Sequence, residues 1–91
     1  MDIGRKMDKK EIEQKVIEII AVQFGIKLDT IKMDTKFITD LGADSLDTVE
    51  IVMMTEDMFD ITMPDEDAEK LMTVGSVVDY VEKNLEDESS K

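Results

Sequence analysis

The apolar residues of the chain recur with helical spacing in three long segments. Asp8, with Glu11 three residues later, resembles a capping box at the start of the first segment, and Gly25 follows its end. Ile17 and Val22 lie off the apolar stripe and are expected at the surface. The stripe itself has the spacing i, i+4, i+7 and i+8 of one helix face and consists of Ile12, Val16, Ile19 and Ile20.

The second segment predicts a helix from Ser45 to about Phe59, with two different faces. One face is expected to pack in the core and carries Thr48, Ile51, Val52, Thr55 and Phe59. The opposite face carries Leu46, Glu50, Met53 and Asp57, flanked by Asp47 and Met54. A solvated face would be polar throughout. Exposed apolar residues interleaved with acids favour a transient docking surface.

Two further helices are predicted after Pro64, a short one over residues 65–71 and a long one that Thr73 caps. Asn84 is expected to end the long helix, and residues 86–91 are expected to form a disordered acidic tail. Tyr80 sits beside the buried stripe of this helix, which comprises Val74, Val77, Val78, Val81 and Leu85.

A long connection, residues 26–44, separates the first two long segments. Asp29 and Asp34, each followed by Thr, are expected to begin short turns. Apolar residues are spread along this loop, so it is expected to be pinned over the core; they are Ile26, Leu28, Ile31, Met33, Phe37, Ile38 and Leu41. Loops of this length in compact domains tend to be functional.

The composition fits one compact helical domain, expected over residues 8–85 after a flexible extension of residues 1–7. The net charge of -12 is unevenly placed. Residues 1–36 hold eight Lys and Arg against seven Asp and Glu, whereas residues 37–91 hold three against sixteen. Such an acidic half repels nucleic acid and anionic membranes and attracts basic partners, although acidic surfaces also simply keep small proteins soluble.

The chain has no Cys and no His. This excludes disulfides, thiolate-bound metals, a Cys nucleophile and a His-dependent catalytic triad. Any thiol chemistry must therefore come from a group added to the chain. No apolar run approaches membrane-spanning length and the N-terminus has no apolar signal region, so we expect a soluble protein without membrane insertion.

Ser45 is the candidate functional residue. Gly42 permits a tight turn before it, and Asp44 and Ser45 lie where the helix begins. The unpaired N–H groups and positive dipole end of a helix favour an anion there, including a phosphodiester built on the serine oxygen. An ordinary N-cap at Ser45 or Asp44 is the alternative interpretation.

The ten residues from Leu41 to Glu50 read LGADSLDTVE and resemble the phosphopantetheine attachment motif of acyl carrier proteins, especially the free-standing type of fatty acid synthesis. The resemblance extends from about Ile12 to Leu85 without an obvious gap. It implies an all-α fold, a four-helix up-and-down bundle with three long helices and one short helix after a long first loop. It also implies a carrier rather than an enzyme.

In the family, the serine at the position of Ser45 receives 4′-phosphopantetheine from coenzyme A through a Mg²⁺-dependent transferase. The resemblance implies a monomer that carries acyl thioesters among fatty acid synthesis enzymes, whose basic patches approach the second helix. It assigns partner docking to Asp44, Leu46, Asp47, Glu50, Met53, Glu56 and Asp57. It assigns a cavity for the acyl chain to Phe37, Ile51, Val52, Thr55, Phe59, Ala68 and Val77.

Thr55 departs from the family pattern, which usually has a larger aliphatic residue at this position of the core face. A buried threonine hydroxyl needs a partner, and in a helix it can donate to the carbonyl four residues earlier. The change is expected to alter the shape or polarity of the acyl cavity while leaving the attachment chemistry intact. The preferred acyl length is therefore open.

Several other functions compete with this interpretation. An acidic adaptor without a prosthetic group would use the same docking face, and a carrier for polyketide, peptide or D-alanyl chemistry would share the attachment serine. A Ca²⁺ sensor fails because no segment has the ligand spacing of an EF-hand loop, and no specific metal site is expected. The expected location is the cytoplasm, or an organelle matrix after removal of a transit peptide.

Overall fold

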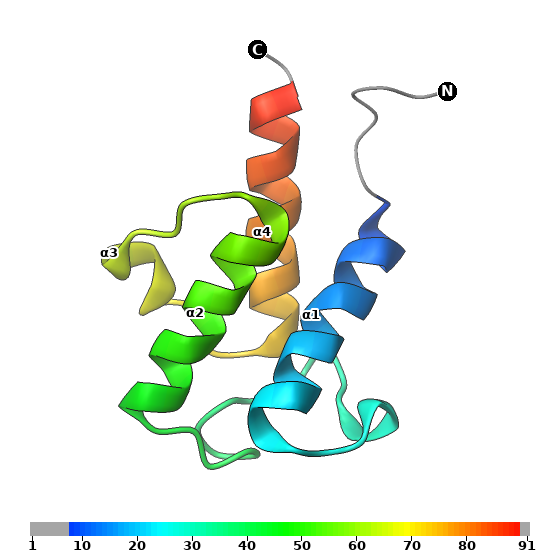
Figure 1. The fold of residues 1–91 in the computed structure, drawn as a ribbon, viewed down its shortest axis with the longest axis vertical. Coiled ribbons are helices and arrows are strands. Elements are labelled where there is room, and N and C mark those ends of the chain that lie inside the picture. Colours follow the sequence, from blue (N-terminus) through cyan, green and yellow to red (C-terminus); the bar gives the residue numbers. More distant parts are fainter. Residues whose placement is uncertain (1–7, 90–91) are drawn as a thin grey trace.

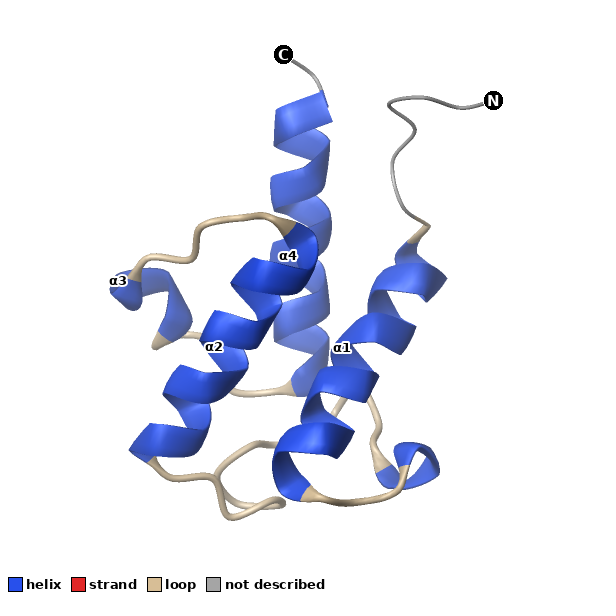
Figure 2. Cartoon of the chain, viewed as in Figure 1, coloured by secondary structure: helices blue, strands red, loops and turns tan. Residues whose placement is uncertain are grey.

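The computed structural model describes residues 8–89, with side chains over residues 8–85, and this part of the chain is helical (Figure 2). The long helices are α1 (Lys9–Phe24), α2 (Ser45–Phe59) and α4 (Val74–Ser89), and α3 (Asp65–Ala68) is a single turn. A 3-10 turn, η1 (Leu28–Thr30), lies in the first loop. The predicted all-α fold with three long helices and one short helix is confirmed.

The three long helices form a bundle with α1 as the shared element, since α1 packs against both α2 and α4. Figure 1 shows α2 and α4 running in the direction opposite to α1. The short α3 lies beside α2, where the chain returns to the start of α4. Among residues 8–89, no helix is long and apolar enough to cross a membrane.

The predicted stripe of α1 is buried, and Ile12, Val16 and Ile20 are fully inaccessible. Val22 is exposed, as predicted, but Ile17 is partly buried and packs against the core, so its prediction as a surface residue is wrong. Because α1 contacts helices on two sides, it buries a wider face than a single stripe.

Both ends of α1 and α2 and the start of α4 follow the predicted start and stop signals. The Glu11 carboxylate accepts a hydrogen bond from the Asp8 backbone N–H at 3.4 Å, and Gly25 follows the end of α1 in the left-handed conformation. Thr73 Oγ1 accepts from the backbone N–H of Ser76 at 3.1 Å at the start of α4. The α2 helix ends as predicted at Phe59.

The first loop is fixed to the connection between α3 and α4 and to the first turn of α4. The Phe37 N–H donates to the Met72 carbonyl at 3.1 Å, and the Gly75 N–H donates to the Met33 carbonyl at 2.7 Å. A Cβ at position 75 would lie 3.0 Å from the Met33 oxygen, so only glycine permits this approach without a shift of the loop. This pairing holds Phe37 over the core.

Two loop residues are not pinned as predicted. Leu28 is 51% exposed on the 3-10 turn, and Ile38 is 66% exposed. The turn that follows Phe37 directs Phe37 inward, where it is buried, and leaves its neighbour Ile38 on the surface.

Two predicted boundaries near the C-terminus are also wrong. The short helix ends at Ala68 rather than at residue 71. The last helix continues to Ser89, so residues 86–89 are helical and not part of a disordered tail. Asn84 donates its side-chain amide to the Tyr80 carbonyl at 3.1 Å, so its polar side chain is satisfied within the helix. The predicted extension of residues 1–7 and the last two tail residues lie outside the described residues.

Candidate functional site

Ser45 is the first residue of α2, and the helix cap is formed by its neighbours. Asp44 adopts the extended N-cap conformation, and its carboxylate accepts a hydrogen bond from the Asp47 N–H at 3.0 Å. The Asp47 carboxylate accepts in return from the Asp44 N–H at 3.2 Å. This reciprocal capping box stabilises the start of the helix without the serine.

The Ser45 hydroxyl is therefore open to solvent. Ser45 is exposed, and its hydroxyl forms no hydrogen bond with any residue in the described part of the chain. Gly42, at φ +67°, makes the turn that delivers the chain to this point. Of the two candidate caps, Asp44 fills the role, and Ser45 is presented at the positive end of the helix dipole.

An open groove of about 800 Å³ begins at Ser45 and runs between α2 and α3. The residues Thr48, Val52, Met63 and Ala68 line both this groove and a small internal cavity. The rest of the groove is lined by Ile38, Ala43, Asp44, Val49, Met53, Glu56, Asp65 and Glu69. The groove, which begins at Ser45, thus shares a wall with the cavity in the bundle.

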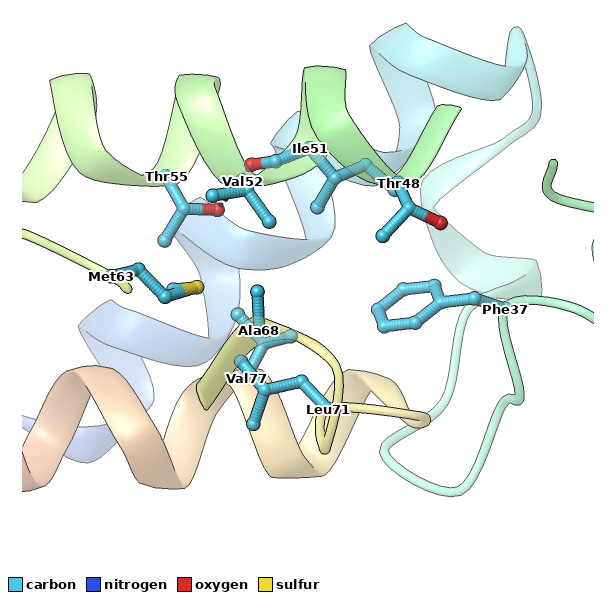
Figure 3. A pocket seen from close by; sticks show the side chains of 9 residues that line it. All are labelled: Phe37, Thr48, Ile51, Val52, Thr55, Met63, Ala68, Leu71 and Val77. Atoms are coloured by element: carbon cyan, nitrogen blue, oxygen red, sulfur yellow. Dashed lines mark hydrogen bonds between the residues drawn. The ribbon is translucent and has the colours of Figure 1, made fainter. Parts of the chain in front are cut away.

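The internal cavity measures about 20 Å³, which is room for about one water molecule. Six of the seven residues predicted to form an acyl cavity line it, namely Phe37, Ile51, Val52, Thr55, Ala68 and Val77 (Figure 3). Phe59, the seventh, is not among the residues that line it; it lies one helical turn beyond Thr55 and is buried in the core.

The sequence reasoning missed three lining residues: Thr48, Met63 and Leu71. Thr48 had been placed on the core face of α2, which was a usable signal. Met63 and Leu71 lie in irregular segments on either side of α3, where no periodicity indicates which way a side chain points. An acyl chain could enter this cavity only if it widened, because the space now present holds roughly one water molecule.

Thr55 brings a fully buried hydroxyl to the cavity wall. Its Oγ1 donates to the Ile51 carbonyl at 2.7 Å, which is the bond predicted from its place in a helix. No buried polar side-chain atom in the described residues lacks a hydrogen-bond partner. The hydroxyl is thus accommodated without strain in an otherwise apolar surrounding.

Comparison with known proteins identifies the family to which this chain belongs. Residues 14–81 match the family model described as the phosphopantetheine attachment site. The chain is 57% identical over 77 residues to an acyl carrier protein of Akkermansia muciniphila, covering 85% of this chain and 96% of that relative. The chain belongs to the acyl carrier proteins. Its prosthetic group is 4′-phosphopantetheine, and its role is that of a carrier rather than an enzyme.

A solved structure agrees with this assignment. The structure of the acyl carrier protein from Enterococcus faecalis, which was studied for its high thermal stability, has a TM-score of 0.74 and 42% sequence identity. The match covers 86% of this chain and 99% of that chain. The helical architecture described above is therefore the acyl carrier protein fold.

The residues around Ser45 fit a phosphopantetheine group. An exposed hydroxyl without an internal partner is free to be esterified, and the capping box would remain intact because it does not use the serine. A phosphodiester at this position would lie at the end of the helix that favours anions. The adjoining groove is lined by both apolar and polar residues on the side of the cavity.

The outer face of α2 has the predicted mixture of apolar and acidic residues. Leu46 is 75% exposed and Met53 is 59% exposed, and both Glu50 and Asp57 are exposed beside them. Val49, which the sequence reasoning did not assign to either face, is 54% exposed and joins this patch. Met54 was expected to flank this face but is partly buried against the core.

Three of the predicted docking acids already hold bonds within the protein. Asp44 and Asp47 form the capping box, and Glu56 Oε2 accepts from the Met63 N–H at 2.7 Å. Asp47 also accepts from the Gln23 side-chain amide of α1 at 3.1 Å. These acids therefore shape the site, whereas Glu50 and Asp57 have no hydrogen bond or ion pair within the described residues.

Hydrogen bonding lowers the pKa of Asp47. The Gln23 amide is the largest cause and the Asp44 N–H the second, and together they hold the pKa of Asp47 below its ordinary 3.8.

No group of three or more acidic residues in the described part of the chain could hold a metal ion.

Proposed function

We propose that Ser45 carries the 4′-phosphopantetheine group and that the protein conveys acyl thioesters between enzymes of fatty acid biosynthesis. The observation that carries this proposal is the position of the Ser45 hydroxyl, exposed and unbonded at the start of α2 and at one end of a groove that shares a wall with the apolar cavity. The group supplies the thiol that the chain lacks. The chain itself positions the attachment point and shelters the cargo.

The site serves to present the Ser45 hydroxyl to another enzyme, since the sequence has no His or Cys that could act as a base or a nucleophile. The capping box fixes the backbone on both sides of Ser45, so the hydroxyl is held at a constant position for a phosphopantetheinyl transferase. Phe37, Ile51, Val52, Thr55, Ala68 and Val77 are the residues that would surround the acyl chain as the cavity widens.

Intact mass spectrometry tests the attachment. We expect the protein, incubated with coenzyme A, Mg²⁺ and a phosphopantetheinyl transferase, to gain the mass of one phosphopantetheine. Ser45→Ala should gain none while keeping the helical circular dichroism of the parent, because the capping box does not use the serine. Absence of any gain with several broad-specificity transferases would favour the acidic adaptor, and modification of Ser45→Ala would move the site elsewhere.

Partner docking is proposed for the outer face of α2. Seven residues were assigned to it: Asp44, Leu46, Asp47, Glu50, Met53, Glu56 and Asp57. Leu46 and Met53 supply exposed apolar contacts, and Glu50 and Asp57 supply carboxylates that basic partner residues can pair with directly. Asp44, Asp47 and Glu56 contribute their charge, but a partner that bonds to them must compete with the internal hydrogen bonds.

A charge reversal distinguishes docking at this face from attraction by the net negative charge of the whole protein. Glu50→Lys should slow transfer by fatty acid synthesis enzymes, mainly through a lower association rate that depends on salt. Glu18→Lys makes the same change of charge at an exposed position on α1 and serves as the matched control. Equal effects of the two variants would show that net charge alone attracts the partners.

The fatty acid assignment is tested by reconstitution. With the enzymes of bacterial fatty acid synthesis, the holo protein should accept malonyl groups and support chain elongation. Activity only with polyketide, peptide or D-alanyl ligase systems would identify one of the alternative carriers.

We further propose that the protein is a monomer in the cytoplasm, with an organelle matrix as the alternative location. We also propose that it does not bind nucleic acid, which its net charge of -12 supports.

A further inference from the structure

The cavity wall has two ends with different chemistry. Figure 3 shows Phe37 and Thr48 at one end and Thr55 and Met63 at the other, with Ala68 facing α2 between them. Thr48 is half-buried near the start of α2 and its hydroxyl donates to the Asp44 carbonyl at 3.1 Å. Thr55 lies two turns further along the helix and is completely buried. The far end thus holds the one fully buried hydroxyl of the lining.

The Thr55 hydroxyl can accept a hydrogen bond but has no proton left to donate. Its hydrogen is used in the 2.7 Å bond to the Ile51 carbonyl, and a hydroxyl oxygen carries two acceptor lone pairs. Of the other side chains at this end, Met63 has a thioether sulfur, which is only a weak acceptor. A cargo group that donates a hydrogen bond therefore meets a suitable partner at Thr55, whereas a saturated chain leaves that oxygen without a second contact.

We propose that Thr55 is a specificity-determining residue whose hydroxyl shifts the preference of the cavity toward acyl chains bearing a hydroxyl group, relative to the same cavity without it. This inference rests on the proposed function, because it concerns the cargo of the same site. Physically, burial of a cargo hydroxyl in a purely apolar cavity leaves the hydroxyl unsatisfied, which disfavours the bound state. The Thr55 oxygen removes that penalty and discriminates the two cargo classes.

The melting temperature of the loaded protein measures this preference, because a chain seated in the cavity of the folded state stabilises that state. The parent, Thr55→Val and Thr30→Val are each loaded with decanoyl or 3-hydroxydecanoyl groups from the corresponding coenzyme A thioesters, and intact mass verifies the loading. Valine preserves the shape of threonine without the hydroxyl. Thr30 is the matched control because its hydroxyl donates to the Lys27 carbonyl at 2.7 Å outside the cavity.

The quantity compared is the melting temperature with the hydroxylated chain minus that with the saturated chain. This difference should be higher in the parent than in Thr55→Val by roughly 2 to 8 °C, as expected for one hydrogen bond in a domain of this size. Thr30→Val should retain the parent value. Loss of the Thr55–Ile51 bond affects both loaded forms alike and so cancels. The same difference in the parent and in Thr55→Val would overturn the proposal.

A second measurement needs no variant of Thr55. In the loaded parent protein, the Thr55 methyl and amide resonances should shift more with the hydroxylated cargo than with the saturated one, and equal shifts would contradict the inference. If transferases do not load the protein, the Ser45 proposal fails separately. The same two tails can then be attached to Ser45→Cys as pantetheine-linked alkylating reagents, because the chain has no other cysteine. The melting and resonance comparisons decide the role of Thr55 on that material too.

Discussion

The carboxylate of Glu56 on α2 accepts a hydrogen bond from the backbone N–H of Met63 at 2.7 Å. This contact joins the last turns of α2 to the segment that leads into α3. The Met63 side chain is only 4% exposed and lines the internal cavity, whereas Glu56 lines the outer groove. One acid thus links the surface proposed for docking to the wall of the cavity.

Removal of the Glu56 carboxylate should destabilise the fold. In Glu56→Ala the part-buried Met63 N–H loses its acceptor, which should lower the free energy of unfolding by about 1–3 kcal/mol. Chemical denaturation monitored by circular dichroism measures the change. The neighbouring Asp57→Ala removes an exposed carboxylate without such a bond and should stay within about 0.5 kcal/mol of the parent. Similar losses in both variants would show that the Met63 bond is not the cause.

The phenol of Tyr80 should titrate above its ordinary range. Burial is the largest cause, and the 2.8 Å hydrogen bond that Tyr80 donates to Asp67 also raises the pKa of Tyr80 above 10.0. Tyr80 is the only tyrosine and there is no tryptophan, so ultraviolet absorbance of the phenolate reports this residue alone. In Asp67→Asn the charged acceptor is gone, and the pKa should move back toward 10.0. A phenolate transition at or below 10 in the parent would contradict this.

The raised pKa also predicts a loss of stability at high pH. The unfolded chain releases the Tyr80 proton before the folded one does, so the contribution is complete below pH 10 and is lost as pH rises through the folded pKa. Lysines titrate in the same window, so the comparison is with Tyr80→Phe, whose stability should fall less between pH 10 and the folded pKa. If the stability of the two proteins changed with pH in the same way, the raised pKa of Tyr80 would not contribute to stability.

The bond from Gln23 to Asp47 should be visible in the titration of Asp47. Gln23→Ala removes the largest cause of the lowered pKa, so the pKa of Asp47 should rise toward 3.8, as measured by carboxyl carbon resonances. The exposed Gln14→Ala on the same helix is the control and should leave the titration unchanged. In the parent, the stability contribution of Asp47 is present above pH 3.8 and is lost as pH falls through the lowered folded pKa.

The sequence predicted those parts of the fold that depend on helical periodicity. The predictions of the α1 stripe, the ends of α2 and the core position of Thr55 were correct because apolar spacing and capping residues agree at those places, and Gly25 marks the end of α1. The end of α4 was predicted wrongly, at Asn84 instead of Ser89. Asn84 satisfies its side-chain amide inside the helix, and the local sequence does not distinguish that from a stop signal.

The candidate site was predictable to the extent that it lies on α2. The cavity residues of α2 follow from its inner face, but Met63 and Leu71 belong to irregular chain whose direction is set by tertiary contacts. The sequence only partly predicts which of the docking acids form hydrogen bonds within the protein and which do not. The spacing of Asp44 and Asp47 resembles a capping box, whereas the Glu56–Met63 bond joins residues seven apart and has no local signature.

Repulsion among acids should make the stability of the domain depend on salt. The chain has no basic residue between Lys36 and Lys70, although this stretch includes all of α2 and α3. We expect the melting temperature to rise with NaCl and to rise further with Mg²⁺ at equal concentration, because ions screen like charges. The response should be graded, since no group of three acids among residues 8–85, whose side chains the structure describes, could hold a metal ion. Asp57→Asn should weaken the salt response more than Asp29→Asn, which neutralises an acid outside this stretch. An unchanged melting temperature with both salts at pH 7 would refute the repulsion, and saturation at micromolar Mg²⁺ would instead identify a specific ion site.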